Sequence, residues 1–179
     1  SFLRDDFGPV LAHAGDQARQ QVGETFELAL PPCWQCPSPS DFGHHNALQA
    51  NDGRWHFIDF EYFGWDDPVK LVADAYWHPG MGLGPELQEQ WLTACRDLFA
   101  DDSGFAERLA AYLPLHGLKW CLVLLNAYLP LGVAQRSHAQ ANPAQNLSDY
   151  KADQLQRARV LLDHIKDMIH EPITALESA

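Results

Sequence analysis

Basic residues are scarce in this sequence: 12 Lys and Arg stand against 24 Asp and Glu, which gives a formal net charge of −12. Nucleic acids and anionic membrane surfaces are bound by clustered Lys and Arg, so this deficit argues against both as the main partner. An acidic surface is compatible with a cationic substrate. With 46% hydrophobic and 20% charged residues, the 179-residue chain has the composition of one globular domain with a sizeable core.

The sequence has no long uninterrupted apolar run, and we expect no leader. No basic segment followed by an apolar one opens the chain. The most apolar stretch, residues 118–134, contains Lys119, Asn126, Pro130 and Gly132, and it is too short and too interrupted to span a bilayer. We expect this stretch to form a buried core helix, and we expect the protein to be cytoplasmic with no membrane span.

A disulfide framework is absent as well. The four cysteines are at positions 33, 36, 95 and 121, which is not the pattern of a small secreted domain. Cys95 and Cys121 lie in apolar helical patterns, where a buried thiol behaves as a small hydrophobic side chain. Cysteine usage therefore agrees with a cytoplasmic protein.

The spacing of apolar residues predicts a mostly helical α+β chain without internal repeats. Helices are predicted over residues 6–21, 68–76, 85–100, 103–112, 113–128 and 147–169. A short strand is predicted over 25–30, an irregular Pro- and Ser-rich loop over 33–45, and a polar loop over 136–145. Asp67 before Pro68 has the features of a helix start, with a capping residue followed by proline at the first helical position.

The clearest local signal is a β-hairpin near residue 50. Residues 47–50 and 54–60 are strand-like runs joined by Asn51-Asp52-Gly53, and Asp-Gly is a favoured hairpin turn. Alternation along the second run places Asp59 on a defined side at the end of the strand. The apolar residues on either side of Asp59 predict that its site is largely buried, where a bare carboxylate is costly without a cation or a donor.

The loop before the hairpin and the end of the hairpin carry three polar residues whose types and order indicate a reaction. Asp41 is followed five residues later by Asn46, then by the hairpin, and then by Asp59. Phosphoryl transfer needs a carboxylate that orients the attacking hydroxyl and accepts its proton. It also needs an amide oxygen and a second carboxylate, because Mg²⁺ prefers a few hard oxygen ligands.

This stretch resembles the catalytic loop and metal motif of the aminoglycoside phosphotransferase and choline kinase family. The family's loop is usually His-Gly-Asp-x-x-x-x-Asn, and Asp41 and Asn46 match its last part. Residues 58–61, Ile-Asp-Phe-Glu, match the following metal motif. Residues 64–68, Gly-Trp-Asp-Asp-Pro, lead to Asp74 as in the family's third element.

The resemblance implies the carboxy-terminal lobe of a protein-kinase-like fold, which transfers phosphate from ATP or GTP to a hydroxyl of a sugar, an amino alcohol or an aminoglycoside-like compound. It implies that Asp41 is the catalytic residue and that Asn46 and Asp59 bind Mg²⁺. Glu61 and Asp74 are implied as supporting residues, with Asp74 accepting hydrogen bonds from the loop backbone. We expect the three central residues to converge on one cleft, with the Asp41 carboxylate unpaired and facing the acceptor.

The sequence departs from the family in two places. Pro39-Ser40 stands where the family generally has His-Gly. Family members also carry an amino-terminal lobe with a lysine that pairs with the nucleotide phosphates, whereas the four lysines here are at positions 70, 119, 151 and 166. We therefore expect residues 1–179 to be the carboxy-terminal lobe without the nucleotide-binding lobe, and to be inactive alone.

Two other functions stay open from the sequence. A pseudokinase or binding module would keep this scaffold without its chemistry, although the retention of all three central residues argues against it. A zinc or thiol-redox domain would use Cys33 and Cys36, the zinc form together with His44 and His45. Against this alternative, adjacent histidines cannot easily both reach one tetrahedral ion, and no thioredoxin-like βαβ pattern surrounds the cysteines.

Overall fold

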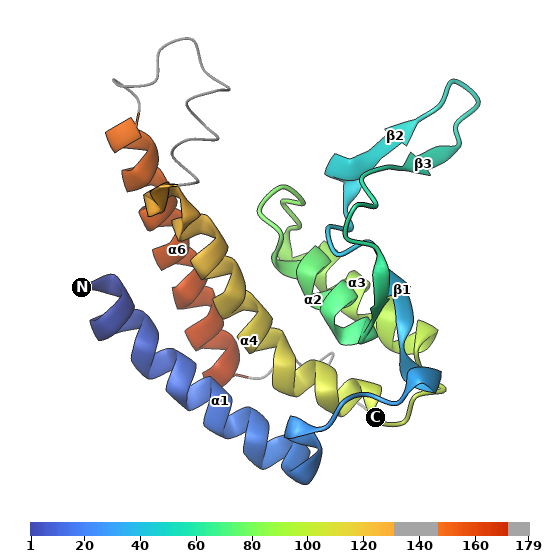
Figure 1. Cartoon of the computed structure of the whole chain (residues 1–179), viewed down its shortest axis with the longest axis horizontal. Helices are drawn as coiled ribbons and strands as arrows, with labels where there is room; N and C mark the ends of the chain where they lie inside the picture. Colours follow the sequence, from blue (N-terminus) through green and yellow to red (C-terminus); the bar gives the residue numbers. More distant parts are fainter. Residues whose placement is uncertain (131–146, 172–179) are drawn as a thin grey trace.

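The chain is mostly helical, with two small antiparallel pairs of strands (Figure 1). The computed structural model describes residues 1–130 and 147–171, so the polar loop predicted over 136–145 lies outside the described residues. The helices are η1 (Phe2–Phe7), α1 (Gly8–Val22), η2 (Gly23–Glu27), η3 (Pro32–Trp34), η4 (His44–Asn46), α2 (Pro68–Trp77), α3 (Pro85–Leu98), α4 (Phe105–Leu124), η5 (Leu125–Tyr128) and α6 (Leu147–His170). The strands are β1 (Cys36–Ser38), β2 (Ala47–Gln49), β3 (Trp55–Phe57) and β4 (Gly64–Asp66). This content confirms the predicted mostly helical α+β class.

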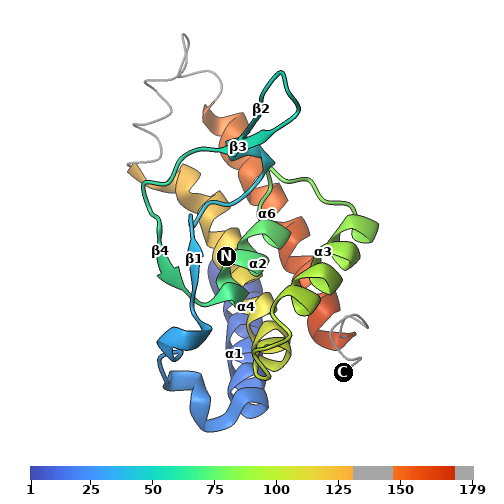
Figure 2. The ribbon, with the colours of Figure 1, turned by 90° about the vertical axis from the view of Figure 1, so that its right-hand side faces the viewer.

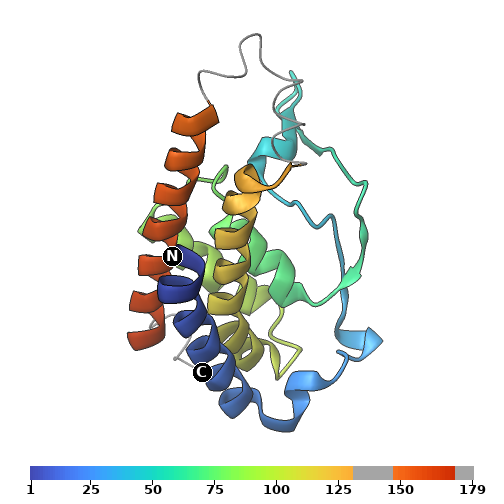
Figure 3. The same cartoon turned by 60° about the vertical axis from the view of Figure 1, so that its left-hand side comes forward.

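Helix α4 is the centre of the molecule, because α1, α2 and α6 all pack against it. Figure 3 shows α1, α4 and α6 running side by side. Leu109, Leu113, Leu118 and Cys121 of α4 are each no more than 1% exposed. They are spread around more than one side of the helix, as expected for a helix that three other helices cover.

By length and composition, the segment Phe105–Tyr128 would also pass as a membrane-spanning helix. Core helices of folded domains meet the same measure, because both kinds of helix are apolar. In this structure 44% of the most apolar window of the segment is buried inside the protein. This burial against three other helices agrees with the expectation of a core helix.

One predicted boundary inside this segment was wrong. The sequence predicted two helices, over 103–112 and 113–128, but α4 is continuous from Phe105 to Leu124 and contains Pro114. A proline inside a helix removes one backbone hydrogen bond. Pro114 itself is nevertheless buried, as are Leu113 and Leu118 on either side of it. Packing against the neighbouring helices therefore carries α4 through a residue that disfavours it.

Strand β1 pairs with β4, with Cys36 opposite Asp66 and Ser38 opposite Gly64. Figure 2 shows this pair next to α2. The prediction of an irregular loop over 33–45 was wrong at β1. The partner strand β4 lies beyond the hairpin, so no local sequence pattern indicates the pairing. The strand predicted over 25–30 was also wrong. Gly23, with φ of 60°, ends α1, and the chain continues as the short turn η2.

The predicted hairpin is confirmed, with shorter strands: β2 pairs with β3, and Gly53 at the turn has φ of 83°. It projects away from the helices (Figure 1). The prediction that its apolar residues bury Asp59 was wrong, because Phe57, Ile58 and Phe60 are 43%, 45% and 49% exposed. The hairpin pairs with no further strand among the described residues, so alternation alone could not say what covers its faces.

We expect Gly117→Ala to destabilise the protein by about 1–3 kcal/mol. A Cβ atom at position 117 would lie 2.8 Å from the Trp77 ring and 2.9 Å from Ile165, so α2 and α6 approach α4 closely there. Gly15→Ala in α1 is the matched control, because its Cβ would meet only the flexible end of Arg19 at 3.4 Å. The control should stabilise by about 0.5–1 kcal/mol. Urea unfolding measures both, and equal effects would contradict the close packing.

Candidate functional site

Both carboxylate oxygens of Asp41, in the loop between β1 and η4, have nitrogen neighbours. Oδ1 lies 3.1 Å from Nε2 of His45 and 3.4 Å from Nε2 of His78. Oδ2 accepts a hydrogen bond from Nδ2 of Asn46 at 3.1 Å, and the same amide group donates to the Asp41 carbonyl at 2.9 Å. The expectation of an unpaired Asp41 carboxylate was therefore wrong. The carboxylate is held, although its side chain remains 41% exposed.

The two imidazoles beside Asp41 form a stacked pair. Their ring centres are 4.0 Å apart and their planes differ by 7°. Nδ1 of His78 accepts a hydrogen bond from the Gly80 backbone N–H at 2.9 Å. Burial lowers the pKa of His78, and His45 lowers it further, against the opposing effects of Asp41 and Asp74. A neutral His78 with this Gly80 contact carries its proton on Nε2, the atom that faces Asp41.

The loop that carries Asp41 has no room for a side chain at Gly43. A Cβ atom there would lie 2.5 Å from the His45 ring and 2.7 Å from Sδ of Met81. The same sulfur accepts a hydrogen bond from the His44 backbone N–H at 3.3 Å. The loop is thus pressed against the segment that follows α2, which brings His45 next to His78.

Ile58, the residue before Asp59, is bonded to Asn46 through the backbone. The N–H of Ile58 donates to the Asn46 carbonyl at 2.9 Å, one residue beyond the strand pairing of β2 and β3. Asp59 itself has φ of 64°, a left-handed conformation that is uncommon for a residue with a side chain, and it is exposed. Glu61 is exposed in the turn that follows. The structure thus puts Asp41 and Asn46 in direct contact, and it bonds the backbone of the residue before Asp59 to Asn46.

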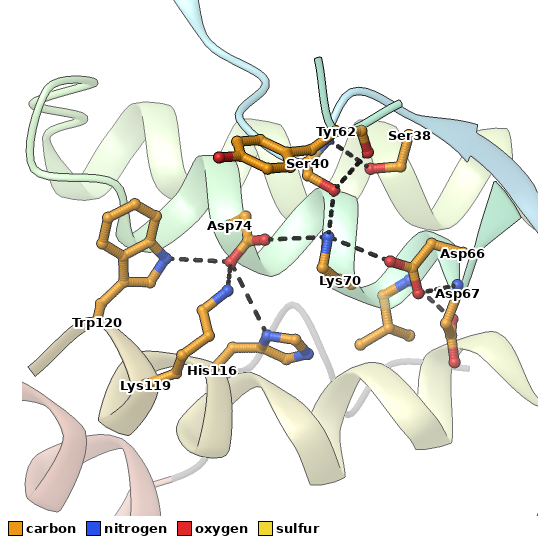
Figure 4. A network of polar contacts seen from close by, with 11 residues as sticks. Ser38, Ser40, Tyr62, Asp66, Asp67, Lys70, Asp74, His116, Lys119 and Trp120 are labelled. Carbon is orange, nitrogen blue, oxygen red and sulfur yellow. Dashed lines mark hydrogen bonds and ion pairs between the residues drawn. The ribbon is translucent and has the colours of Figure 1, made fainter. Parts of the chain in front are cut away.

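Ser40, immediately before Asp41, is a second residue in the left-handed region, with φ of 63°. Its N–H donates to the Oγ of the buried Ser38 at 3.2 Å, and its own hydroxyl donates to the Tyr62 carbonyl at 3.3 Å. Nζ of Lys70 in α2 donates to the same hydroxyl at 3.0 Å (Figure 4). A strained backbone persists only where its surroundings determine it, and here three contacts do so.

Asp74 lies at the centre of the polar network in Figure 4 and is only 3% exposed. Its Oδ1 accepts hydrogen bonds from Nζ of Lys119 and from Nε1 of Trp120, the latter at 3.1 Å, both from α4. Lys70 approaches its other oxygen to 3.7 Å. Asp74 was expected to accept from the catalytic-loop backbone. Instead its partners are side chains, and Lys70 bridges Asp74 to Ser40 in that loop.

The predicted capping role of Asp67 is confirmed. Its Oδ1 accepts a hydrogen bond from the N–H of Val69 at 2.9 Å, at the start of α2. Arg108 of α4 contacts the same carboxylate at 3.1 Å and Asp102 at 2.6 Å. Asp67 therefore fixes the start of α2 against α4, which is a structural role.

The cysteine pair receives no support as a metal or redox site. Cys33 is an exposed free thiol, and Cys36 is half-buried and also free. Burial raises the pKa of Cys36, and Asp67 and Asp66 raise it further, which disfavours the reactive thiolate. Among the residues that the structure describes, the group of three or more side chains with metal-binding spacing does not include either cysteine.

Sequence reasoning missed Lys70 and His78 as parts of the site. Lys70 and Asp74 are four residues apart on α2, and His78 follows by another four at its end. Residues with this spacing share one face of a helix. The other residues of α2 are mostly apolar. A row of three polar residues on one face of such a helix is a signal that could have identified Lys70 and His78.

Comparison with known proteins gives no relative for this chain: no family model, no curated protein and no solved structure matches it. Function is therefore inferred from the residues of this site and from their geometry.

The half-buried His116 near Asp74 makes a pH-dependent effect on stability testable. Burial lowers the pKa of His116 to about 4; Asp74 and Asp67 oppose this, whereas Lys119 and Lys70 add to it. A histidine whose folded pKa lies below its unfolded value stabilises the fold fully above about pH 6.5 and loses that contribution as the pH falls toward 4. We expect wild type to lose about 1–3 kcal/mol more than His116→Phe between pH 7.5 and pH 4.5 in urea unfolding.

The exposed His56 of the hairpin provides the control for this experiment. His56→Gln should follow the pH dependence of the wild type, because an exposed imidazole is solvated in both states. If His116→Phe and wild type lost stability in parallel, His116 would not be held neutral in the fold.

Proposed function

We propose that this chain is the acceptor-side lobe of an ATP- or GTP-dependent phosphotransferase that acts on a hydroxyl of a small molecule. The observation that carries the proposal is the double role of Asn46. Its side chain holds the Asp41 carboxylate, and its carbonyl receives the N–H of Ile58, the residue before Asp59. Asp41 and Asn46 are thus in contact and the residue before Asp59 is bonded to Asn46, and these are the residue types that phosphoryl transfer requires.

In this proposal Asp41 receives the proton of the acceptor hydroxyl. An ionised carboxylate offers about four acceptor positions, and the three nitrogen neighbours of Asp41 take at most three of them. The remaining position can bind the acceptor hydroxyl, and the exposed side of Asp41 gives it access. The neighbours keep the carboxylate in one orientation, which is what a general base needs before proton transfer.

Asn46 and Asp59 have the donor atoms that fit Mg²⁺. The Asn46 amide nitrogen is used on Asp41, which leaves its side-chain oxygen for a cation. Asp59 supplies an exposed carboxylate, one residue after the Ile58 N–H that donates to the Asn46 carbonyl. Both are hard oxygen ligands, as Mg²⁺ prefers. When bound with its nucleotide, the ion supplies neutralisation of the phosphate charge; the protein groups hold it and orient the acceptor.

A hollow near His78 is a suitable place for the body of the acceptor. Its volume is about 340 Å³, and it begins at Pro79, the residue after His78. It is lined by Trp77, Pro79, Leu124, Gln156, Arg157, Val160, Leu161 and His164. Small-molecule sites are mostly apolar with a few polar groups at the edge, and this lining has that character.

The nucleotide itself requires a second part of the enzyme in this proposal. Proteins of this chemistry bind the phosphates with a lysine from an amino-terminal lobe, and the first lysine here is Lys70, whose amino group is engaged by Ser40 and Asp66. Apolar side chains around Asp59 are exposed, among them Tyr62 at 70% and Phe63 at 55%. Exposed apolar surface of this kind favours coverage by another lobe.

The direct test is phosphate transfer from Mg²⁺–ATP or Mg²⁺–GTP to a panel of sugars, amino alcohols and aminoglycosides by the full-length gene product. We expect Asp41→Asn to lower turnover by about 10²–10⁴-fold with nearly unchanged nucleotide affinity, because it removes only the proton acceptor. Asp59→Asn should also weaken Mg²⁺-dependent nucleotide binding. Asp101→Asn, in an exposed loop between α3 and α4, is the matched control and should leave both unchanged.

Two results would count against the proposal. Full turnover in Asp41→Asn would remove the general base. Tight nucleotide binding without transfer to any acceptor would favour a binding module that keeps the scaffold without chemistry.

Residues 1–179 alone should bind Mg²⁺–ATP weakly and transfer no phosphate, because they contribute no lysine for the α- and β-phosphates. Isothermal calorimetry with Mg²⁺–ATP and Mg²⁺–GTP measures this. Micromolar affinity for either nucleotide would show that the second lobe is not needed for binding.

A further inference from the structure

Three side chains converge at the site in a way that phosphate transfer does not require. Oδ1 of Asp41, Nε2 of His45 and Nε2 of His78 all lie within 4.8 Å of one another. They come from the loop after β1, from η4 and from the end of α2. The measured separations from the Asp41 oxygen are 3.1 Å to His45 and 3.4 Å to His78.

The two separations from the Asp41 oxygen are those of neighbouring ligands around a transition metal ion. Zinc binds nitrogen and carboxylate oxygen at about 2.0–2.2 Å, and a tetrahedral arrangement then places neighbouring ligand atoms about 3.3 Å apart. Two imidazoles and one carboxylate suit Zn²⁺ and its first-row neighbours, whereas Mg²⁺ prefers oxygen alone. We propose that Asp41, His45 and His78 form a binding site for a divalent transition metal ion of the Zn²⁺ class.

The three side chains are gathered at a place that is open to solvent. Asn46 fixes the second oxygen of Asp41, and the absence of a side chain at Gly43 lets the His45 ring lie where it does. The side chains of Asp41, His45 and His78 are 41%, 25% and 17% exposed. Three protein ligands with one open position is the pattern of zinc sites that exchange a water or bind a substrate oxygen.

Two features must change when a metal binds. The stacked rings of His45 and His78 are nearly parallel, so one of them must turn before both Nε2 atoms can face the same ion. The hydrogen bond at Nδ1 of His78 must change as well. The Gly80 N–H donates to Nδ1 of His78, which keeps the ring proton on Nε2, whereas a metal on Nε2 requires that proton on Nδ1. His78 to Met81 form a turn closed by the Met81 N–H and the His78 carbonyl at 2.9 Å, with Pro79 and Gly80 at its centre.

This turn can supply the new partner without unfolding. Gly80 does not have a positive φ here, so the turn is not type II. Proline followed by glycine is a favoured type II sequence, and types I and II differ by a flip of the central peptide. That flip would replace the Gly80 N–H beside Nδ1 of His78 by the Pro79 carbonyl. A carbonyl that accepts from the outer nitrogen of a ligating histidine is the usual support of a metal site.

The metal site and the Mg²⁺ site of the proposed function would share the neighbourhood of Asp41 but use different ligands. An ion held by Asp41, His45 and His78 occupies the carboxylate that the proposed function needs as a proton acceptor. If both proposals hold, Zn²⁺ inhibits phosphate transfer in competition with the acceptor. Metal binding itself does not depend on the proposed function, because it involves neither nucleotide nor acceptor.

The test uses the 179-residue chain with the metal alone. Titration with Co²⁺, followed by its visible absorption, and competition for Zn²⁺ with a chromophoric chelator measure stoichiometry and affinity. We expect one ion per chain, and at least about 100-fold weaker binding in His45→Gln and in His78→Gln. His44→Gln is the matched control, because this neighbouring imidazole is outside the group. Cys36→Ser controls for thiol ligation.

Folding and tautomer state are checked separately. Circular dichroism and thermal unfolding, measured in the presence of a chelator, show whether each variant folds. If His78→Gln, at the less exposed histidine, does not fold, the metal affinity of His45→Gln tests the site. Imidazole nitrogen shifts measured by NMR should report that Zn²⁺ moves the proton of His78 from Nε2 to Nδ1. Absence of stoichiometric binding, equal loss in His44→Gln, or loss only in Cys36→Ser would overturn the site. Such a failure leaves phosphate transfer, measured with Mg²⁺ alone, as an independent result.

Discussion

A carboxylate taken out of water costs several kcal/mol unless opposite charges and donors surround it. Asp74 is such a group, and the way it is neutralised determines how the site is built. Lys119 and Trp120 reach it from α4, and Lys70 approaches it from its own helix. Lys70 also holds Ser40, so the charge balance of Asp74 connects the helical core to the loop that carries Asp41.

This connection explains why the loop tolerates a strained backbone. Ser40 and Asp59 both have left-handed φ values, which are unfavourable for residues with a side chain. Ser40 is bonded to β1, to the segment after β3 and to α2, so three elements fix its conformation. Ile58, the residue before Asp59, donates its N–H to the Asn46 carbonyl. In the sequence, the two left-handed residues lie on either side of Asp41 and Asn46.

Sequence patterns predicted the local parts of the molecule and missed what depends on distant contacts. Helical periodicity gave α1, α2, α3 and α6 close to their observed bounds, and the Asp52-Gly53 turn gave the hairpin, because these signals are local. The continuity of α4 through Pro114, and the pairing of β1 with β4, depend on packing between distant segments.

The same limit applies to the site. The order of Asp41, Asn46 and Asp59 could be read directly from the sequence. That Asn46 contacts Asp41 follows from their spacing in one loop. The contact of His78 with Asp41 could not be predicted in this way, because it joins residues from two elements through the packing of α2. Exposure of the hairpin was likewise not predictable, since alternation reports two faces but not what covers them.

The hairpin has a consequence for the behaviour of the chain in solution. Its two strands, β2 and β3, pair only with each other among the described residues, so each has an open edge of unpaired backbone groups. Leu48 and Trp55 on these strands are each 58% exposed. Open edges that carry apolar side chains recruit further strands. We therefore expect the isolated chain to self-associate edge to edge as its concentration rises, to an extent that its three-residue strands limit, and we expect any segment that covers the hairpin to act against aggregation.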